Sequence, residues 1–118
     1  MRPTFPITET CSEAGLCWRF DLPAESPFFT GHFPGHPLLP GVVALGWLLA
    51  AAERFHGGEP ALPLVLHNVK FQVVLLPGQP GLELSIIPQG PTRRLLARLI
   101  SPAGMHASAW LEPAAPVG

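Results

Sequence analysis

A loop rich in proline and glycine in the first third of the chain carries two histidines. His32 and His36 lie within residues 30–37, where prolines recur every third residue up to Pro40. Each proline fixes its own φ and restricts the residue before it, so we expect a stiff loop. Imidazole is the side chain whose ordinary pKa, about 6.5, lies nearest neutral pH. The loop is therefore suited to hold a proton-transfer group in a fixed position.

An uncharged apolar segment follows this loop directly. Residues 42–52 contain no charged side chain, a proline precedes them and a glycine pair lies beyond them. This arrangement predicts a helix from Gly41 or Val42 to about Phe55. A helix that is apolar on every side is expected to be buried on every side. The segment has about half of the ~20 residues that a membrane span needs, so we expect a core helix.

Six further segments have the composition and spacing of β-strands. Apolar and polar side chains alternate most clearly in residues 15–22, and clusters of proline and glycine separate the later segments. The predicted strands cover residues 4–11, 15–22, 64–76, 82–87, 93–100 and 105–111. Two strands, one helix and four strands predict an α+β domain, in which a curved antiparallel sheet wraps around the helix. The 118 residues are expected to form one domain over residues 1–118.

The composition narrows the class of protein. Apolar residues make up 47% of the chain and charged residues only 13%, so we expect a partner subunit to cover part of the surface. The net charge of −1 argues against nucleic-acid binding through a basic face. No apolar leader follows Met1, and no pair of His, Cys, Asp or Glu residues has metal-ligand spacing. We therefore expect a cytoplasmic protein with two reduced thiols and no metal.

Residues 28–49 resemble the active-site segment of a known family. Gly31-His32-Phe33-Pro34, followed by Pro37, Pro40, Gly41 and Val42, is similar to the corresponding segment of the hot-dog-fold 3-hydroxyacyl-[acyl-carrier-protein] dehydratases of fatty acid biosynthesis. The branch associated with aryl polyene biosynthesis is the most similar, and a weaker similarity continues over residues 64–84. The resemblance implies the hot-dog fold, whose element order is the one predicted above. It also implies the elimination of water from a 3-hydroxyacyl thioester to give a 2-enoyl thioester.

The same resemblance implies the partners of the chain. The acyl group would be carried on the phosphopantetheine arm of an acyl carrier protein, and the protein would need no cofactor of its own. The active site would form across the interface of a homodimer, or of a heterodimer with another hot-dog subunit. Carrier proteins are acidic, so a cationic surface is expected near the mouth of the acyl tunnel. The available cations are Lys70, Arg93, Arg94 and Arg98.

The resemblance assigns roles to five residues. His32 is the base that removes a proton from C2 of the substrate. Gly41 lies nine residues later, at the predicted helix start, where free N–H groups and the macrodipole stabilise negative charge on a thioester oxygen. Val42, Phe33 and His36 are expected beside the substrate. The residues alone leave other roles open, since His32 could satisfy backbone carbonyls and Gly41 could simply begin the helix.

The usual general acid is missing. Dehydratases of bacterial chain elongation carry a glutamate or aspartate fourteen residues after the histidine, where this chain has Gly46. His32 could act as both base and acid, a partner subunit could supply the acid, or the chain could be a non-catalytic subunit that pairs with an active dehydratase. We expect a weakened or partner-dependent hydro-lyase, because loss of a general acid costs ~10²–10⁴ in rate. An acyl thioesterase of the same fold ranks last, because residues 38–52 contain no carboxylate.

The remaining predictions concern the tunnel and the other histidines. An apolar tunnel beside the helix would be lined by residues that would also suit a simple core, namely Phe33, Leu39, Val42, Leu45, Trp47 and Phe71. His67 is expected to form a hydrogen bond at the start of a strand. His56 and His106 are expected to lie on the surface.

Overall fold

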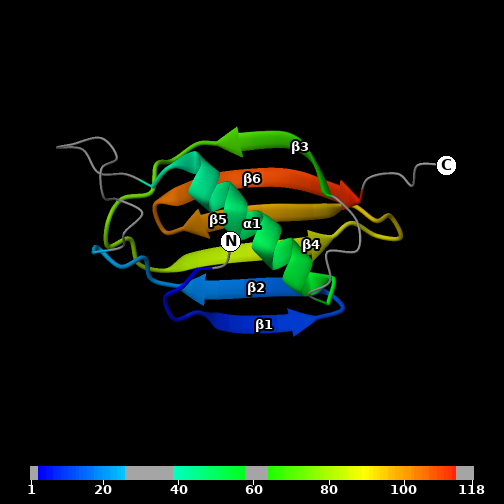
Figure 1. Cartoon of the computed structure of the whole chain (residues 1–118), viewed down its shortest axis with the longest axis horizontal. Coiled ribbons are helices and arrows are strands. Elements are labelled where there is room, and N and C mark those ends of the chain that lie inside the picture. Colours follow the sequence, from blue (N-terminus) through cyan, green and yellow to red (C-terminus); the bar gives the residue numbers. More distant parts are fainter. Residues whose placement is uncertain (1–2, 26–38, 58–63, 114–118) are drawn as a thin grey trace.

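The computed structural model describes residues 3–25, 39–57 and 64–113, so His32, Phe33 and His36 lie outside the described residues. The described chain forms one antiparallel sheet of six strands, and a long helix, α1, lies across one face of it (Figure 1). The sheet order is β1-β2-β4-β5-β6-β3, which makes β1 and β3 the two edge strands. This architecture confirms the predicted α+β fold and the predicted order of the elements.

The elements have the following bounds. They are β1 (Thr8–Ser12), β2 (Gly15–Phe20), α1 (Gly41–Phe55), β3 (Leu64–Phe71), β4 (Leu82–Pro88), β5 (Leu95–Ser101) and β6 (Gly104–Pro113). Four predicted strands are shorter than expected. The first begins at Thr8 rather than at residue 4, and the second ends at Phe20 rather than at residue 22. The strand after the helix ends at Phe71 rather than at residue 76, and β5 begins at Leu95 rather than at residue 93.

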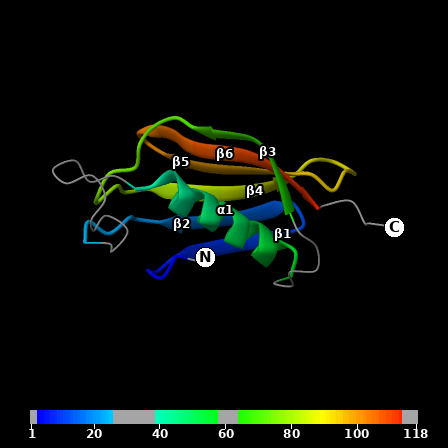
Figure 2. The same cartoon turned by 45° about the horizontal axis from the view of Figure 1, so that its top comes forward.

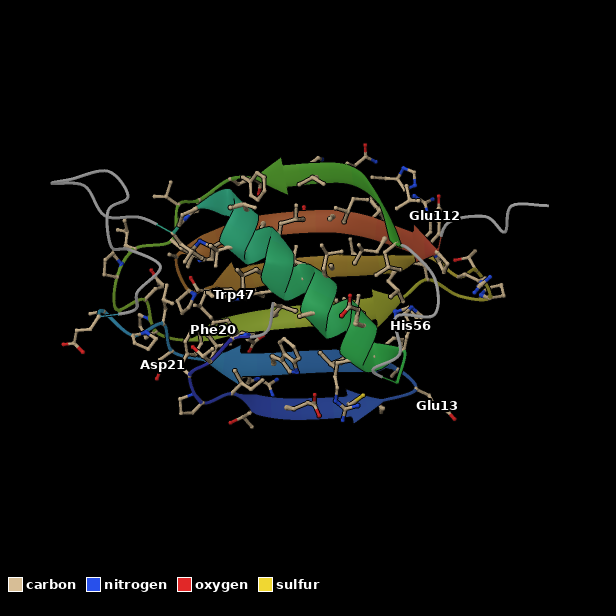
Figure 3. All side chains as sticks on the ribbon, viewed as in Figure 1. Glu13, Phe20, Asp21, Trp47, His56 and Glu112 are labelled. Atoms are coloured by element: carbon tan, nitrogen blue, oxygen red, sulfur yellow. The ribbon has the colours of Figure 1, made fainter. Side chains whose placement is uncertain are left out.

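Alternating burial along the strands shows which of their side chains face α1. In β2, Leu16, Trp18 and Phe20 are buried, whereas Arg19 between them is exposed. The strands β4, β5 and β6 bury alternate residues in the same way, and α1 packs on all four of these strands. Trp47 reaches from the helix toward Phe20, and the two rings meet edge to face with centroids 5.6 Å apart (Figure 3). One apolar layer between the helix and the sheet is therefore the core.

The helix is buried on one face only, and the prediction of burial on every side is wrong for the described chain. The side chains that face the sheet are Val43, Ala44, Trp47, Leu48, Ala51 and Ala52. On the opposite face, Val42 is 71% exposed, and Leu45, Gly46, Leu49 and Ala50 are half-buried. The described sheet covers one side of α1, as Figure 2 shows. An apolar helix face is thus left facing away from the sheet.

The edge strand β3 is irregular. Its pairing with β6 shifts in register between His67 and Lys70, and Asn68 lies in this interval with a φ of 50°. A left-handed residue within a strand marks a bulge, which locally increases the twist. The edge strand β3 is therefore divided into a regular run that ends at His67 and a short run that begins at Lys70.

We predict that the two faces of α1 contribute unequally to stability. Leu48 is fully buried against the sheet, so Leu48→Ala should lower the free energy of unfolding by about 2–5 kcal/mol. Val42 lies on the opposite face, so Val42→Ala should change it by no more than about 0.5 kcal/mol. Urea unfolding of the two variants provides the measurement, and equal losses would contradict the packing described above.

Candidate active site

The helix α1 begins at a residue that leaves its amide end open. Pro40 is the N-cap, with φ −60° and ψ 139°, and its carbonyl accepts hydrogen bonds from Val43 N–H at 3.0 Å and Ala44 N–H at 3.4 Å. By helix geometry the N–H groups of Gly41 and Val42 have no partner within the helix. The macrodipole places its positive end here, and the first turn carries no acidic residue to offset it.

A pocket of about 290 Å³ opens beside this helix start. One side is formed by Leu39, Gly41 and Ala44 around the first turn of α1. The other side is formed by Phe71 at the end of β3, by residues 72–75 that follow it, and by His106 of β6. Apart from Gln72 and His106, every side chain at the pocket is apolar. The pocket therefore combines an apolar lining with an open, electropositive helix end.

Gly41 allows a close approach at the pocket. A Cβ atom on Gly41 would lie 3.2 Å from two ring carbons of Phe71, closer than most real contacts of this kind. The glycine thus allows the Phe71 ring to lie directly against the helix start. Sequence reasoning placed Gly41 at the helix start but did not identify Phe71 as its neighbour, because the two residues are thirty positions apart.

Backbone hydrogen bonds join the pocket wall to the strand β6 and to the helix start. Gln72 N–H donates to the carbonyl of His106 at 3.1 Å, and Val73 N–H donates to that of Met105 at 3.0 Å. Two residues further on, Leu39 N–H donates to the carbonyl of Leu75 at 2.8 Å. Figure 2 shows this part of the chain, between β3 and β4, passing beside the first turn of α1. The segment 72–75 was predicted as part of a strand, but it serves as the pocket wall.

His106 is buried, so the prediction that it lies on the surface is wrong. It is 3% exposed, its Nδ1 donates to the carbonyl of Val73 at 2.9 Å, and its Nε2 lies 2.7 Å from the hydroxyl of Ser101. Simple alternation along β6 would turn His106 away from the core. However, Leu99 pairs with Ala107 while Ile100 pairs with Met105, so His106 is the extra residue of a bulge. Sequence alternation gives no signal for such an insertion.

The other predicted tunnel residues separate into distinct environments. Leu39 and Phe71 line the pocket, whereas Trp47 is fully buried in the core. Leu45 is half-buried on the other face of α1, and Val42 is exposed and does not line this pocket.

Among the predicted cationic candidates, Arg94 contacts side chains of β6. Arg94 lies over the ring of Trp110, 4.9 Å from its centroid, and 3.8 Å from a carboxylate oxygen of Glu112. The other carboxylate oxygen of Glu112 accepts a hydrogen bond from His67 at 2.6 Å, which confirms the expected hydrogen-bonding role of His67. Glu112 lies at one end of the sheet and Asp21 at the other (Figure 3).

Lys70 lies at the same end of the sheet as the pocket. It directly precedes Phe71 and Gln72, which line the pocket, and it is exposed. Arg93 and Arg94 precede Leu95, and β5 runs about 20 Å from there to Ser101 beside His106. Lys70 is therefore closer to the pocket wall than Arg93 and Arg94 are. Arg98 lies in the same row of the sheet as Lys70, since both residues pair with Ser108.

The described residues contain no group of three His, Cys, Asp or Glu side chains that could hold a metal ion. Cys11 and Cys17 are free thiols on the paired strands β1 and β2. Within the described part of the chain, α1 is too short to cross a membrane.

A six-stranded antiparallel sheet with one long helix across it is the architecture of the hot-dog fold. Over 92% of its length the chain matches the solved structure of the dehydratase heterocomplex ApeI:P from Xenorhabdus doucetiae, with a TM-score of 0.72 and 25% identity, and it covers 97% of that chain. It also matches the fold of the dehydratase domain of a mycocerosic acid synthase-like polyketide synthase, with a TM-score of 0.72 and 19% identity, over 96% of this chain and 40% of that one.

The sequence matches narrow the class to a family. The model of the ApeI-like family, described as ApeI dehydratase, matches residues 8–98, and the chain belongs to this family. The 3-hydroxyacyl-[acyl-carrier-protein] dehydratase FabZ of Haemophilus influenzae is 34% identical over 73 residues, which are 56% of this chain and 49% of that protein. FabZ of Geobacter metallireducens is 40% identical over 62 residues, which are 46% of this chain and 41% of that protein. The chain thus spans about half the length of the curated relatives it matches.

We predict that the Phe71 ring cancels the stabilisation that Gly41→Ala would otherwise give. Alanine is a better helix former than glycine, so Gly41→Ala should raise the free energy of unfolding by about 0.5–1 kcal/mol where there is room for its methyl group. With Phe71 present this gain should be lost, because the ring lies 3.2 Å from the new Cβ. In a Phe71→Leu background the gain should return. Urea unfolding of the four chains measures this coupling, and the same effect in both backgrounds would contradict it.

Proposed function

We propose that this chain is a dehydratase subunit that acts on a 3-hydroxyacyl thioester carried by an acyl carrier protein. His32 removes the proton from C2, the C3–O bond breaks, a double bond forms between C2 and C3, and the hydroxyl leaves as water after it gains a proton. The Gly41 N–H group stabilises the charge that develops on the thioester oxygen during proton removal. Phe33 and His36 are proposed to lie beside the substrate, whereas Val42 is exposed on the opposite face of α1 and does not line this pocket.

One observation carries this proposal: the pocket contains the open amide end of α1. The apolar lining of Leu39, Phe71 and Leu75 suits an acyl chain, and the first turn of the helix offers N–H donors at one side of it. The family membership supplies the reaction class. Lys70, beside the pocket wall, is our candidate for contact with the acidic carrier protein.

We further propose that the chain works together with a second hot-dog subunit. Gly46 occupies the position of the usual acid and lies on the helix face that the sheet leaves open, since it is four residues from Val42. The nearby surface is apolar as well, because Val65, Val69, Phe71, Val73, Val74 and Leu76 are all exposed on β3 and the segment after it. An apolar edge strand is a ready surface for pairing with another chain. A partner seated there could bring a general acid to the open face of α1.

A second candidate function follows from Gly46 itself. A chain without the helix carboxylate could serve as a non-catalytic subunit that stabilises an active dehydratase. The two functions differ in whether His32 takes part in turnover.

The decisive experiment measures loss of water by mass spectrometry. The purified chain, alone and with a second hot-dog subunit, would be given a 3-hydroxyacyl carrier protein. We predict that His32→Ala lowers turnover by ~10²–10⁴, because it removes the base. His56→Ala is the matched control, since His56 is exposed at the other end of α1. Unchanged turnover by a complex that contains His32→Ala would favour the non-catalytic role.

We also predict that an acid can be restored at position 46. Gly46→Glu places a carboxyl group on the open face of α1, and the glycine-to-glutamate change itself favours the helix by up to about 1 kcal/mol. If the acid limits the chain alone, Gly46→Glu should raise its turnover by ~10–10². Gly46→Gln has nearly the same shape but no acidic proton, so it should give no gain. Equal turnover by both variants would show that a missing acid is not the limit.

A further inference from the structure

We propose that His106 is a positioning residue that sets the width of the acyl pocket by holding the Val73 carbonyl, and so determines which acyl groups fit beside Gly41. This inference rests on the function proposed above, in that it takes the pocket to be the acyl site. It adds a residue on β6, far in the sequence from both the histidine loop and the helix.

The first step is the fixed orientation of the imidazole. His106 is almost completely buried, and both of its ring nitrogens lie within hydrogen-bond distance of a partner. A carbonyl oxygen can only accept, so Nδ1 carries a proton and donates to Val73. The Ser101 hydroxyl oxygen accepts from Ala103 N–H at 3.1 Å, and its own hydrogen is free to point at Nε2 of a neutral ring. The ring is thus held at both ends.

The second step is that Nδ1 donates to Val73 whether the ring is neutral or charged. Gaining a proton adds one at Nε2 and leaves the Nδ1 proton in place, and the Ser101 oxygen can accept from the charged ring. Nδ1 therefore remains a donor to Val73 in either state, which suits His106 to position the pocket wall.

The third step is that hydrogen bonds hold the wall before it reaches the core. Phe71, Val73 and Val74 are 53%, 39% and 55% exposed, whereas Leu75, at the far end of the wall, is 3% exposed and packs in the core. After the backbone bonds at Gln72 and Val73, the wall is hydrogen-bonded again where Leu39 N–H donates to the Leu75 carbonyl. The His106 imidazole holds the Val73 carbonyl between these points. It therefore controls where the wall lies before it meets the helix start.

The fourth step links the wall position to selectivity. The Leu75 carbonyl accepts a hydrogen bond from Leu39 N–H just before the helix, and the Phe71 ring lies against Gly41. An acyl thioester whose oxygen points at Gly41 would place its first carbons between these two side chains. A wall held close admits an unbranched chain and excludes a branched one, whereas a released wall would admit both.

Two substitutions test the hydrogen bonds at the two ring nitrogens of His106 separately. In His106→Asn, the side-chain amide can donate from nearly the position of Nδ1, so the bond to Val73 is kept and the contact with Ser101 is lost. In His106→Gln, the amide reaches the position of Nε2 instead, so the contact with Ser101 is kept and the bond to Val73 is lost. Ser101→Ala removes the hydroxyl alone and is the matched control for the Ser101 end.

The experiment measures the binding of two saturated thioesters to the full chain by calorimetry. Hexanoyl-pantetheine and its branched isomer 4-methylpentanoyl-pantetheine lack the 3-hydroxyl group, so binding is read without turnover. We expect His106→Gln to weaken hexanoyl binding by about tenfold and to bring the affinity ratio of the two probes close to one. His106→Asn and Ser101→Ala should keep the wild-type ratio, even if their thermal stability falls.

The outcomes are distinct. Equal loss of the affinity ratio in His106→Asn and His106→Gln would indicate a merely structural role and would overturn the proposal. An unchanged affinity ratio in His106→Gln would also overturn it. If His106→Gln does not fold, His106→Asn provides the test, because loss of the affinity ratio in His106→Asn would also overturn the proposal. Absence of binding by the wild-type chain would refute the acyl site. Selective binding without dehydration in any assay would leave the role of His106 standing and would refute the proposed reaction.

Discussion

The packing of α1 across the sheet through one face is the constraint on which the rest of the structure depends. The buried face, centred on Trp47 and Leu48, fixes the helix against β2, β4, β5 and β6. This packing places the first turn of α1 beside the chain that leaves β3, where Leu39 and Leu75 are joined by a backbone hydrogen bond. The open amide end of the helix consequently faces an apolar wall. A pocket with a preorganised positive end follows from the core packing rather than from any charged side chain.

The same constraint leaves the opposite face of α1 without cover from the sheet. Val42 and Gly46 lie on this face, together with half-buried apolar side chains. Gly46, where the resemblance leads us to expect an acid, therefore lies on the face away from the sheet, toward the space that a second chain would occupy in our proposal. Our proposal explains both the missing carboxylate and the uncovered helix face in the same way, because the functional unit would comprise this chain and a second subunit.

Local patterns were sufficient to predict most of the fold. The period of two in β2 and the uncharged run bounded by proline and glycine gave the elements and their order, because these signals depend on neighbouring residues. The errors arose where contacts between distant residues decide the outcome. The bulge that buries His106 depends on how β6 pairs with β5, and the end of β3 at Phe71 depends on the wall formed by the next four residues. Of the predicted site, Gly41 could be placed at the helix start, but its contact with Phe71 required the tertiary structure.

The irregular edge strand has a consequence for how chains can associate. A long, flat, apolar edge can template the addition of one strand after another, which leads to open-ended aggregates. In β3 the left-handed Asn68 and the shifted register interrupt the row of outward N–H and C=O groups. Only a strand with a matching interruption can pair along the whole edge, so this surface favours a single partner of defined register and resists fibre growth.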